Sequence, residues 1–421
     1  PHGKDGRGLV TRLEEKIRRH PRITVFTDAE VVGKSGSFGN YEVNIRVGRE
    51  RPEATVRETN SLETLTVEAG SIVVATGFDS YAPQAGEFGY GLDGVLTLPD
   101  FKRLVDSSDG PLSYHGTPVR TIVYVYCVGS RQPEGNEYCS RYCCTAAIHS
   151  SLQVAAKTAS SGAAAGAAAP RISQYHLYRD VRAYGKYELL YNESREKGDL
   201  YLRFPDDEPP VVAEASVGGR VATDSGGQGH RLTVTTRDLL TGGAELVIPA
   251  DLVVLVTGMV PRGNDELVRA LKLPVGNDGF FNEIHPKLRP VETVVDGVLI
   301  CGACQSPKNS AEAVASGLAA VTQSASILKR GYAELDPLIA VVDPNACEWC
   351  GLCLEACPYD APRRVEEGGK EVAFIDRAAC KGCGGCVPVC PKNAIDLLGY
   401  TDAQIRAMID GLLQELTPCQ T

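Results

Sequence analysis

The sequence predicts an α/β protein with a dinucleotide-type core and a small cysteine-rich domain at its C-terminal end. Two segments, 71–78 and 251–258, are apolar runs that end in glycine, which is typical of buried strands whose ends approach a ligand. Near the C-terminus, eight cysteines fall into two regular runs. With 421 residues, and about 150 per domain, the chain has room for two to four domains.

The N-terminal region is predicted to form a helix and a small antiparallel sheet. An amphipathic pattern covers residues 9–19, and strand-like runs follow at 23–26, 41–47 and 64–67. The strand at 71–78 includes Thr76 and Gly77 near its end. Glycine lets the backbone approach a bound group closely, so both residues are candidates for cofactor contact. An ordinary buried strand has the same pattern.

A strand, a turn and a helix at residues 297–328 give a second candidate for cofactor contact. The strand ends at Gly302, and the helix is expected to begin after Asn309, which forms a capping box with Glu312. The free amide groups and positive dipole of such a helix end suit a flavin or phosphate anion, with Lys308 and Ser310 beside it. A solvent-exposed lysine before an ordinary cap is the alternative interpretation. No G-x-G-x-x-G motif follows a strand in this sequence, so the usual pyrophosphate cradle is not predicted.

Four cysteines follow the predicted strand at 119–126. In a dinucleotide-binding domain, the end of the first strand holds the pyrophosphate. Here Cys127 takes that place, and Cys139, Cys143 and Cys144 precede a predicted helix at 145–157, whose N-terminal dipole favours thiolates and an anionic cluster. Buried or disulfide-forming cysteines are the alternative, because the adjacent pair departs from ferredoxin spacing.

The two C-terminal runs follow the bacterial ferredoxin spacing C-x2-C-x2-C-x3-C-P. In two-cluster ferredoxins the fourth cysteine of each run binds the other cluster, so each 4Fe-4S cluster takes three cysteines from one run and one from the other. The first predicted set is Cys347, Cys350, Cys353 and Cys390, and the second is Cys380, Cys383, Cys386 and Cys357. Zinc knuckles are the alternative, although they rarely show this third step followed by x3-C-P.

The segments around these motifs are predicted more simply. Between the ferredoxin runs, residues 363–375 are predicted to form a hairpin that turns at Gly368 and Gly369, and residues 401–416 an amphipathic helix that covers its own domain or docks a partner. Residues 155–170 are expected to be a surface insertion, and residues 216–230 a glycine-rich turn. Cys301 and Cys304 have C-x2-C spacing but are expected to be small apolar core residues.

Composition narrows the compartment and the partners. The net charge of −10 offers no basic stripe for phosphates, which argues against nucleic acid as a partner. No apolar run approaches the roughly 20 residues of a membrane helix, so we expect no direct membrane insertion. Because the cysteines are in cluster spacing and no signal peptide opens the chain, a reducing cytoplasm is expected.

The chain resembles the A subunit of heterodisulfide reductase and its bacterial relatives. The stretches that carry this resemblance span most of the sequence: FGYG at 88–91, CVGSR at 127–131, YCSRYCC at 138–144, DVRAYGK at 180–186, and GAC at 302–304 with Pro307 and Lys308. The resemblance implies a core built like thioredoxin reductase, in which an unusual 4Fe-4S cluster replaces nicotinamide binding. It makes Cys127, Cys139, Cys143 and Cys144 the ligands of that cluster.

The resemblance also implies a domain plan. It is a partial flavin domain at 1–115, a middle cluster-bearing domain at 116–290, a return segment of the flavin domain at 291–335, a two-cluster ferredoxin domain at 336–400 and a C-terminal helix at 401–421.

Two departures from the family pattern concern the flavin and the cluster count. The N-terminal flavin fingerprint is missing, and residues 48–65 contain no cysteine where many members insert another ferredoxin module. We therefore expect three 4Fe-4S clusters, with FAD bound only if the missing N-terminal half is supplied. The sequence is a truncated fragment, or a separate chain supplies the flavin half, or the flavin has been lost.

The expected function is electron transfer within a multi-subunit reductase, active only in complex. The resemblance implies that FAD splits electron pairs between the clusters, which is flavin-based electron bifurcation. It implies partners similar to the B and C subunits of heterodisulfide reductase and electron-input subunits from a hydrogenase or dehydrogenase, with a homodimer inside the larger complex as one arrangement. The alternative is a flavin-free iron-sulfur relay between two partner enzymes.

Overall fold

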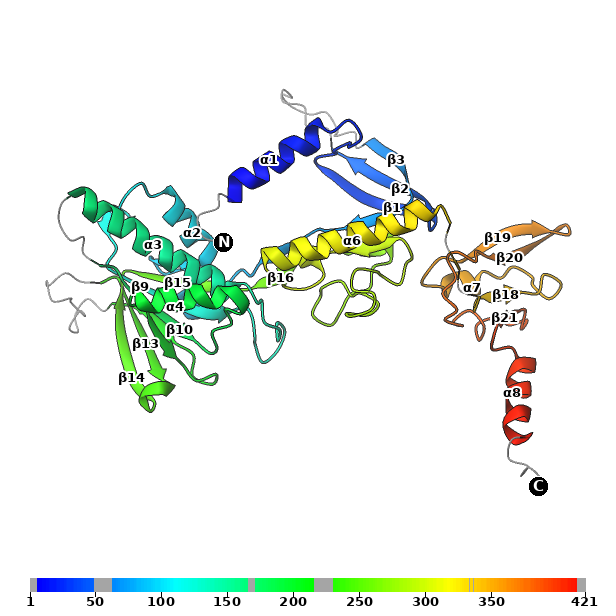
Figure 1. Ribbon diagram of the computed structural model, residues 1–421. Coiled ribbons are helices and arrows are strands. Elements are labelled where there is room, and N and C mark those ends of the chain that lie inside the picture. The colour runs from blue at the N-terminus through cyan, green and yellow to red at the C-terminus, as the bar shows by residue number, and fades with distance from the viewer. Residues whose placement is uncertain are drawn as a thin grey trace, which may run out of the picture.

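The computed structural model describes residues 6–48, 63–165, 171–215, 230–332, 334–335 and 337–414. The described chain is elongated (Figure 1). A layered sheet domain lies at one end, the long helix α6 (Ser310–Arg330) and a small antiparallel sheet lie in the centre, and the cysteine-rich domain lies at the other end.

The N-terminal helix and antiparallel meander are confirmed, with one strand in a different place. Helix α1 spans Gly6–Arg19, and strands β1 (Ala29–Ser37), β2 (Asn40–Val47) and β3 (Glu63–Ala69) pair in sequence order. The strand predicted at 23–26 was wrong, because those residues lie in a loop. The two-residue connection between Ser37 and Asn40 pairs β2 with residues 29–37 and fixes the register.

The central part is built from short strand pairs. Strand β4 (Ile72–Val74) runs parallel to β17 (Val298–Ile300), and β5 (Phe78–Ser80) runs antiparallel to β16 (Met259–Pro261). The single strand predicted at 71–78 is therefore divided in two. Gly77 lies between the halves with φ 77°, a left-handed conformation that glycine adopts without strain.

The middle domain contains a five-stranded parallel sheet in the order β11-β10-β9-β15-β6. Its strands are β6 (Val95–Thr97), β9 (Thr121–Val128), β10 (Ser173–Tyr178), β11 (Leu200–Arg203) and β15 (Leu252–Thr257). Helices α2 (Leu98–Ser107), α3 (Cys143–Ala165) and α4 (Glu188–Glu196) lie between these strands in the sequence. The sheet thus includes residues before position 116, where the sequence placed the start of this domain. Every residue of β15 is buried, as expected for a central parallel strand.

The rest of the middle domain is smaller. A hairpin is formed by β7 (Ser113–Tyr114) and β8 (Thr117–Pro118), and an antiparallel sheet by β12 (Val211–Glu214), β13 (Leu232–Asp238) and β14 (Ala244–Ala250). Helix α5 spans Asp265–Leu271. The surface insertion predicted at 155–170 is instead helical up to Ala165, because its alanines favour helix. Residues 166–170 and 216–229 lie outside the described part of the chain.

The cysteine-rich domain is held together by two antiparallel strand pairs. Strand β18 (Ala340–Val342) pairs with β21 (Ile395–Leu397), and β19 (Pro362–Glu367) pairs with β20 (Lys370–Ile375), which confirms the predicted hairpin. Helix α7 spans Leu352–Glu355. The terminal helix α8 (Asp402–Gln414) extends away from this domain with its apolar side chains exposed (Figure 1).

A buried carboxylate joins the starts of the two central strands. Asp251, just before β15, accepts hydrogen bonds from the backbone amides of Arg120 and Thr121 at 2.7 and 3.1 Å. Its other oxygen lies 3.0 Å from Nδ1 of His230, which is also buried. Side chain and backbone groups of three segments therefore depend on one carboxylate.

We predict that Asp251→Ala lowers the free energy of unfolding by about 3 kcal/mol, because two backbone amides and a histidine lose their acceptor. Chemical denaturation followed by circular dichroism measures the change. The matched control is Glu14→Ala, which removes an exposed pair with Arg18 and should cost at most about 1 kcal/mol. Equal effects for both variants would contradict the prediction.

Candidate functional site

The cysteine-rich domain contains a cavity that matches the first predicted cluster set. The cavity has a volume of about 80 Å³, and Cys347, Cys350 and Cys353 from the first run line it together with Cys390 from the second. Trp349 and Ile395 also line this space. The structure thus brings three cysteines of one run next to the fourth cysteine of the other.

A second cavity, of about 20 Å³, matches the other predicted set. It is lined by Cys380, Cys383 and Cys386 and by Cys357 from the first run. The exchange of the fourth cysteine between the two runs is therefore present in both cavities. Among the described residues, no group of three or more His, Cys, Asp or Glu side chains is close enough to hold a single metal ion. The cysteines surround cavities instead.

Backbone amides point at four of these sulfur atoms in a repeated pattern. The first cysteines of the two runs, Cys347 and Cys380, accept hydrogen bonds from the amides of the strand residues Ala373 and Ala340 at 3.3 and 3.4 Å. The fourth cysteine of each run accepts from the residue four positions later, at 3.5 Å in the first run and 3.3 Å in the second. Such bonds stabilise negative charge on sulfur and tune cluster potentials.

The four middle-domain cysteines lie at the carboxyl end of the parallel sheet. Cys127 is the second-last residue of β9 and has φ 62°, while Cys143 and Cys144 begin α3. Strand β9 lies between β10 and β15, and the chain leaves it towards β10, so this end is the topological switch point where α/β sheets bind ligands. Three of the four cysteines are buried, and Cys139 is partly buried.

Two serines hold the loop between Cys127 and Cys143 against the neighbouring strand. The backbone amide of Ser140 donates to Oγ of Ser130 at 3.1 Å, and the amide of Met259 donates to Oγ of Ser140 at 2.9 Å. A side chain on Gly258 would place its Cβ only 2.5 Å from that same hydroxyl. The loop therefore packs closely on the residues after β15.

Arginines surround the middle-domain cysteines. Burial raises the pKa of Cys127 to about 11, while the charges of Arg131 and Arg179 oppose this rise. Arg131 Nη1 and Arg179 Nε are buried without a hydrogen-bond partner, although each lies within ion-pair range of a carboxylate. Arg182 also interacts with Cys139. Buried cations with spare donors fit a cluster that carries net negative charge with its four thiolates.

The predicted flavin-contact residues come together from two segments. Because β4 and β17 are adjacent and parallel, Thr76 and Gly77 lie after one strand and Gly302 after the other. Gly77 and Gly302 have φ of 77° and 75°, and a Cβ on either would meet no atom within 4 Å. This open, glycine-lined space is compatible with a cofactor close to the backbone.

The N-terminal end of α6 adds positive charge beside that space. Asn309 caps the helix, and the capping box with Glu312 is confirmed. Lys308 is partly buried, burial lowers its pKa, and its hydrogen bonds reach the neutral oxygens of Gln305 and Ser306 at 3.1 and 2.7 Å. An ammonium held by neutral acceptors and a helix N-terminus together favour an anionic ring system.

This helix end contacts the cysteine loop directly, a contact that sequence reasoning missed. Arg141, between Cys139 and Cys143, binds Glu312 at 2.6 Å. The hydroxyl of Tyr184 donates to the same Glu312 oxygen at 2.9 Å and lies 3.0 Å from Nδ2 of Asn309. Arg141 and Tyr184 lie inside the family-like stretches, but only the fold shows that they meet α6.

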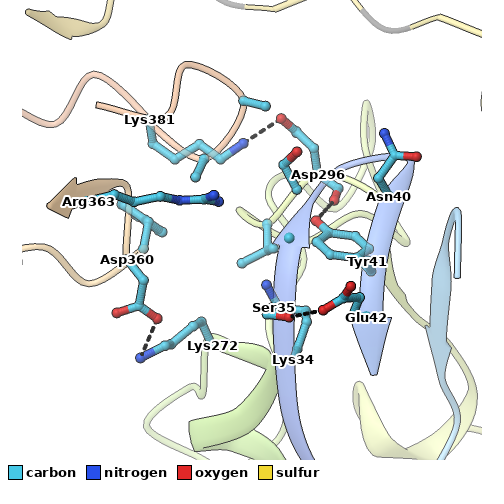
Figure 2. Close-up of a pocket in the computed structure, with 16 residues that line it drawn as sticks. Lys34, Ser35, Asn40, Tyr41, Glu42, Lys272, Asp296, Asp360, Arg363 and Lys381 are labelled. Carbon is cyan, nitrogen blue, oxygen red and sulfur yellow. Dashed lines mark hydrogen bonds and ion pairs between the residues drawn. The ribbon is translucent and has the colours of Figure 1, made fainter. Parts of the chain in front are cut away.

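The cysteine-rich domain meets the central part through ion pairs around a cavity of about 470 Å³ (Figure 2). Lys381, next to Cys380, pairs with Asp296, and Lys272 pairs with Asp360 at 3.1 Å. In Figure 2 both pairs lie beside the space between the hairpin of β1 and β2 and the cysteine-rich domain. The second cysteine set is therefore the one nearer to the core.

Within the described part of the chain, no helix is both long enough and apolar enough to cross a membrane. Cys301 and Cys304 are buried in two apolar clusters beside β17, and Sγ of Cys304 donates to the carbonyl oxygen of Val74 at 3.5 Å.

Comparisons with known proteins agree with this geometry. A family model described as a 4Fe-4S dicluster domain matches residues 340–397. The iron-sulfur A subunit of CoB-CoM heterodisulfide reductase from Methanocaldococcus jannaschii is 36% identical over 371 residues, which are 85% of this chain and 52% of the relative. The A subunit of the H2/formate:CoB-CoM heterodisulfide,ferredoxin reductase from Methanococcus maripaludis is 36% identical, with the same 85% and 52% coverage.

A solved structure is also similar over much of the chain. The HOCl-induced flavoprotein disulfide reductase RclA of Escherichia coli has a TM-score of 0.43 and 11% identity, over 81% of this chain and 66% of that one. This chain spans about half the length of the two curated relatives. The mixed α/β class is confirmed by the parallel sheet and its helices. The sequence matches confirm the resemblance, and over the residues it spans the chain belongs to the family of heterodisulfide reductase iron-sulfur A subunits.

Proposed function

We propose that this chain distributes electrons between a flavin and three 4Fe-4S clusters, as one component of a larger reductase complex. The observation that carries the proposal is the contact of Arg141 with Glu312, which joins the cysteine loop to the helix end beside the flavin-contact residues. A cofactor at each place would be in adjacent segments. The name of the Methanococcus maripaludis relative includes both a heterodisulfide and ferredoxin, which supports two destinations for split electron pairs.

The proposed cluster ligands are the three cysteine sets. Cys127, Cys139, Cys143 and Cys144 would hold the middle-domain cluster, and the sets that line the two cavities would hold the ferredoxin clusters. A cluster supplies one-electron transfer at a potential set by burial and hydrogen bonds to sulfur. This chain contributes the amide donors to four sulfurs and the arginines beside Cys127.

The proposed flavin contacts are Thr76, Gly77, Gly302, Lys308 and Ser310, with Asn309 as the cap of α6. A flavin exchanges electrons in pairs or singly, which one-electron clusters cannot do alone. Gly77 and Gly302 would let the ring approach the backbone, while Lys308 and the α6 N-terminus would stabilise negative charge on it. The described residues form only the two-stranded part of this sheet, β4 with β17.

That incomplete sheet favours the second candidate, a relay without flavin on this chain alone. Val314, Leu318 and Val321 of α6 are all exposed, and so is Val73 in β4. Parallel sheets are normally covered on both faces, so the flavin site needs further structure next to α6 and β4. Flavin content separates the two candidates: binding only when the remaining flavin half is supplied supports the first, and none in either case supports the relay.

We propose that the partners are the other components of such a reductase, similar to the B and C subunits of heterodisulfide reductase, with a hydrogenase or dehydrogenase as electron input and the cytoplasm as the compartment. Helix α8 offers one docking element, since Ile405, Met408, Ile409, Leu412 and Leu413 are exposed along it.

We predict about 12 iron atoms and as many acid-labile sulfides per chain after anaerobic reconstitution, four for each cluster. Cys127→Ser should lower the iron content to about 8, because one 4Fe-4S cluster loses a ligand. Iron and sulfide analysis measures both values. The matched control is Cys301→Ser, a buried cysteine outside the three sets, which should keep about 12. About 8 iron atoms in the unmodified chain would contradict the middle-domain cluster.

We also predict that Lys308→Met lowers the flavin reduction potential in flavin-loaded protein. Removing the ammonium destabilises the reduced, more negative flavin by about 1 kcal/mol. A spectrophotometric redox titration measures the shift. Lys329→Met, in the last turn of the same helix, is the control and should leave the potential unchanged. An unchanged titration for Lys308→Met would remove this residue from the site.

A further inference from the structure

A row of aromatic rings crosses the middle-domain sheet next to its cysteines. His176 in β10 is fully buried and lies directly across from Tyr124 in β9 and Tyr201 in β11. Its ring is nearly parallel to both, at centroid distances of 4.6 and 4.4 Å. Neither the proposed cluster ligands nor the proposed flavin contacts include this histidine.

Hydrogen bonds connect the same histidine to both sides of the domain. Tyr126 OH lies 2.9 Å from His176 Nδ1, and His176 Nε2 lies 3.4 Å from Asp199 Oδ2. Ser194 donates to that carboxylate oxygen at 2.8 Å, and the hydroxyls of Ser194 and Tyr201 are 2.7 Å apart. The five side chains form a continuous relay of groups that can carry protons.

One end of this relay is at the cysteines and the other is towards solvent. Tyr126 directly precedes Cys127, and its pKa is raised first by burial and further by Tyr201 and the thiol of Cys144. His176, Asp199 and Ser194 are buried, whereas Tyr201 is partly exposed. The relay therefore gives a proton from solvent a path to the buried histidine.

The charged and titratable groups around His176 come from every element packed against it. They are Tyr124 and Tyr126 from β9, Asp199 and Tyr201 from the β11 region, and Ser194 and Tyr191 from α4, with Cys144 of α3 near Tyr201. Gln174, on β10 itself, donates to Asp199 Oδ1 at 3.2 Å. Within this set of side chains, Asp199 supplies the carboxylate.

The protonation state of this pair follows from the environment. Burial lowers the pKa of His176, while Asp199 opposes that effect; burial also opposes the hydrogen bonds from His176, Ser151 and Ser194 that lower the pKa of Asp199. With Nε2–H facing the carboxylate, Nδ1 accepts from the Tyr126 hydroxyl. The imidazole is thus neutral and ready to take one proton. A buried His–Asp pair costs desolvation that an apolar side chain would avoid.

We propose that His176 takes up a proton from solvent, through Tyr201, Ser194 and Asp199, when the middle-domain cluster receives an electron. This inference rests on the proposed function, because it requires that cluster. The step is balanced: one electron from the reduced flavin, or from dithionite in the test, enters the cluster, and one proton from solvent converts the imidazole to imidazolium. Tyr126 then accepts from Nδ1–H and turns its own hydrogen towards the cysteines.

The sign of the pH dependence follows from charge. Reduction adds one negative charge near His176, so it raises the pKa of the imidazole. Between the lower pKa with the oxidised cluster and the higher one with the reduced cluster, each electron brings one proton. In that range the cluster potential falls by about 59 mV for each pH unit, a tenfold change in a one-electron equilibrium.

The test is a redox titration of the middle-domain cluster followed by electron paramagnetic resonance, repeated from about pH 5 to 8 on the reconstituted full chain. The Cys127→Ser variant identifies the signal by its loss. We expect a sloped region in the unmodified chain and a flat line in His176→Phe. Tyr126→Phe keeps the ring and removes only the hydroxyl that faces His176, so it should reduce the slope while the chain stays folded.

The matched control is His230→Phe, which removes the other buried histidine that faces an aspartate, at the opposite end of β9. It should keep the slope of the unmodified chain. A potential independent of pH in the unmodified chain, or an unchanged slope in both His176→Phe and Tyr126→Phe, would overturn the inference. An iron content of about 8 would instead refute the proposed middle-domain cluster itself, so the two failures are distinguishable.

Discussion

The parallel pairing of β9 with β15 is the constraint on which the rest of the site depends. The two strands are far apart in the sequence, yet their pairing places Thr257 opposite Val128, the residue after Cys127. At this edge Ser140 can bind the amide of Met259, which keeps the cysteine loop on the sheet. Helix α3 then starts at Cys143, so its dipole faces the same point.

The two kinds of cysteine site differ in their surroundings, and this difference suits a protein that distributes electrons. Cys350 and Cys383 of the cysteine-rich domain are exposed, whereas Cys127, Cys143 and Cys144 are buried. A reduced cluster carries more negative charge, which a buried site stabilises less than water does unless cations are near. Arginines beside Cys127 supply that compensation in the middle domain. Burial and charge therefore favour separate potentials within one chain.

Local patterns predicted the cysteine sets, the α6 cap and the long strands, because spacing and hydrophobic periodicity record local constraints. The exchange of Cys357 and Cys390 was predictable only from the repeat of a known spacing. The strand at 29–37 was missed since its register depends on a two-residue turn rather than on its own apolar residues. The contacts of Arg141 with Glu312 and of Tyr126 with His176 join distant segments, and no local pattern records such pairs.

The ion pairs that hold the cysteine-rich domain to the core give this junction a dependence on salt. Lys272 with Asp360 and Lys381 with Asp296 are partly exposed, and they border a cavity rather than an apolar seam (Figure 2). At physiological ionic strength the Debye length is about 8 Å, so added salt weakens such contacts far more than it weakens a hydrophobic interface. The spacing between the outer clusters and the core is therefore set by electrostatic attraction, and the rate of electron exchange across it falls as ionic strength rises.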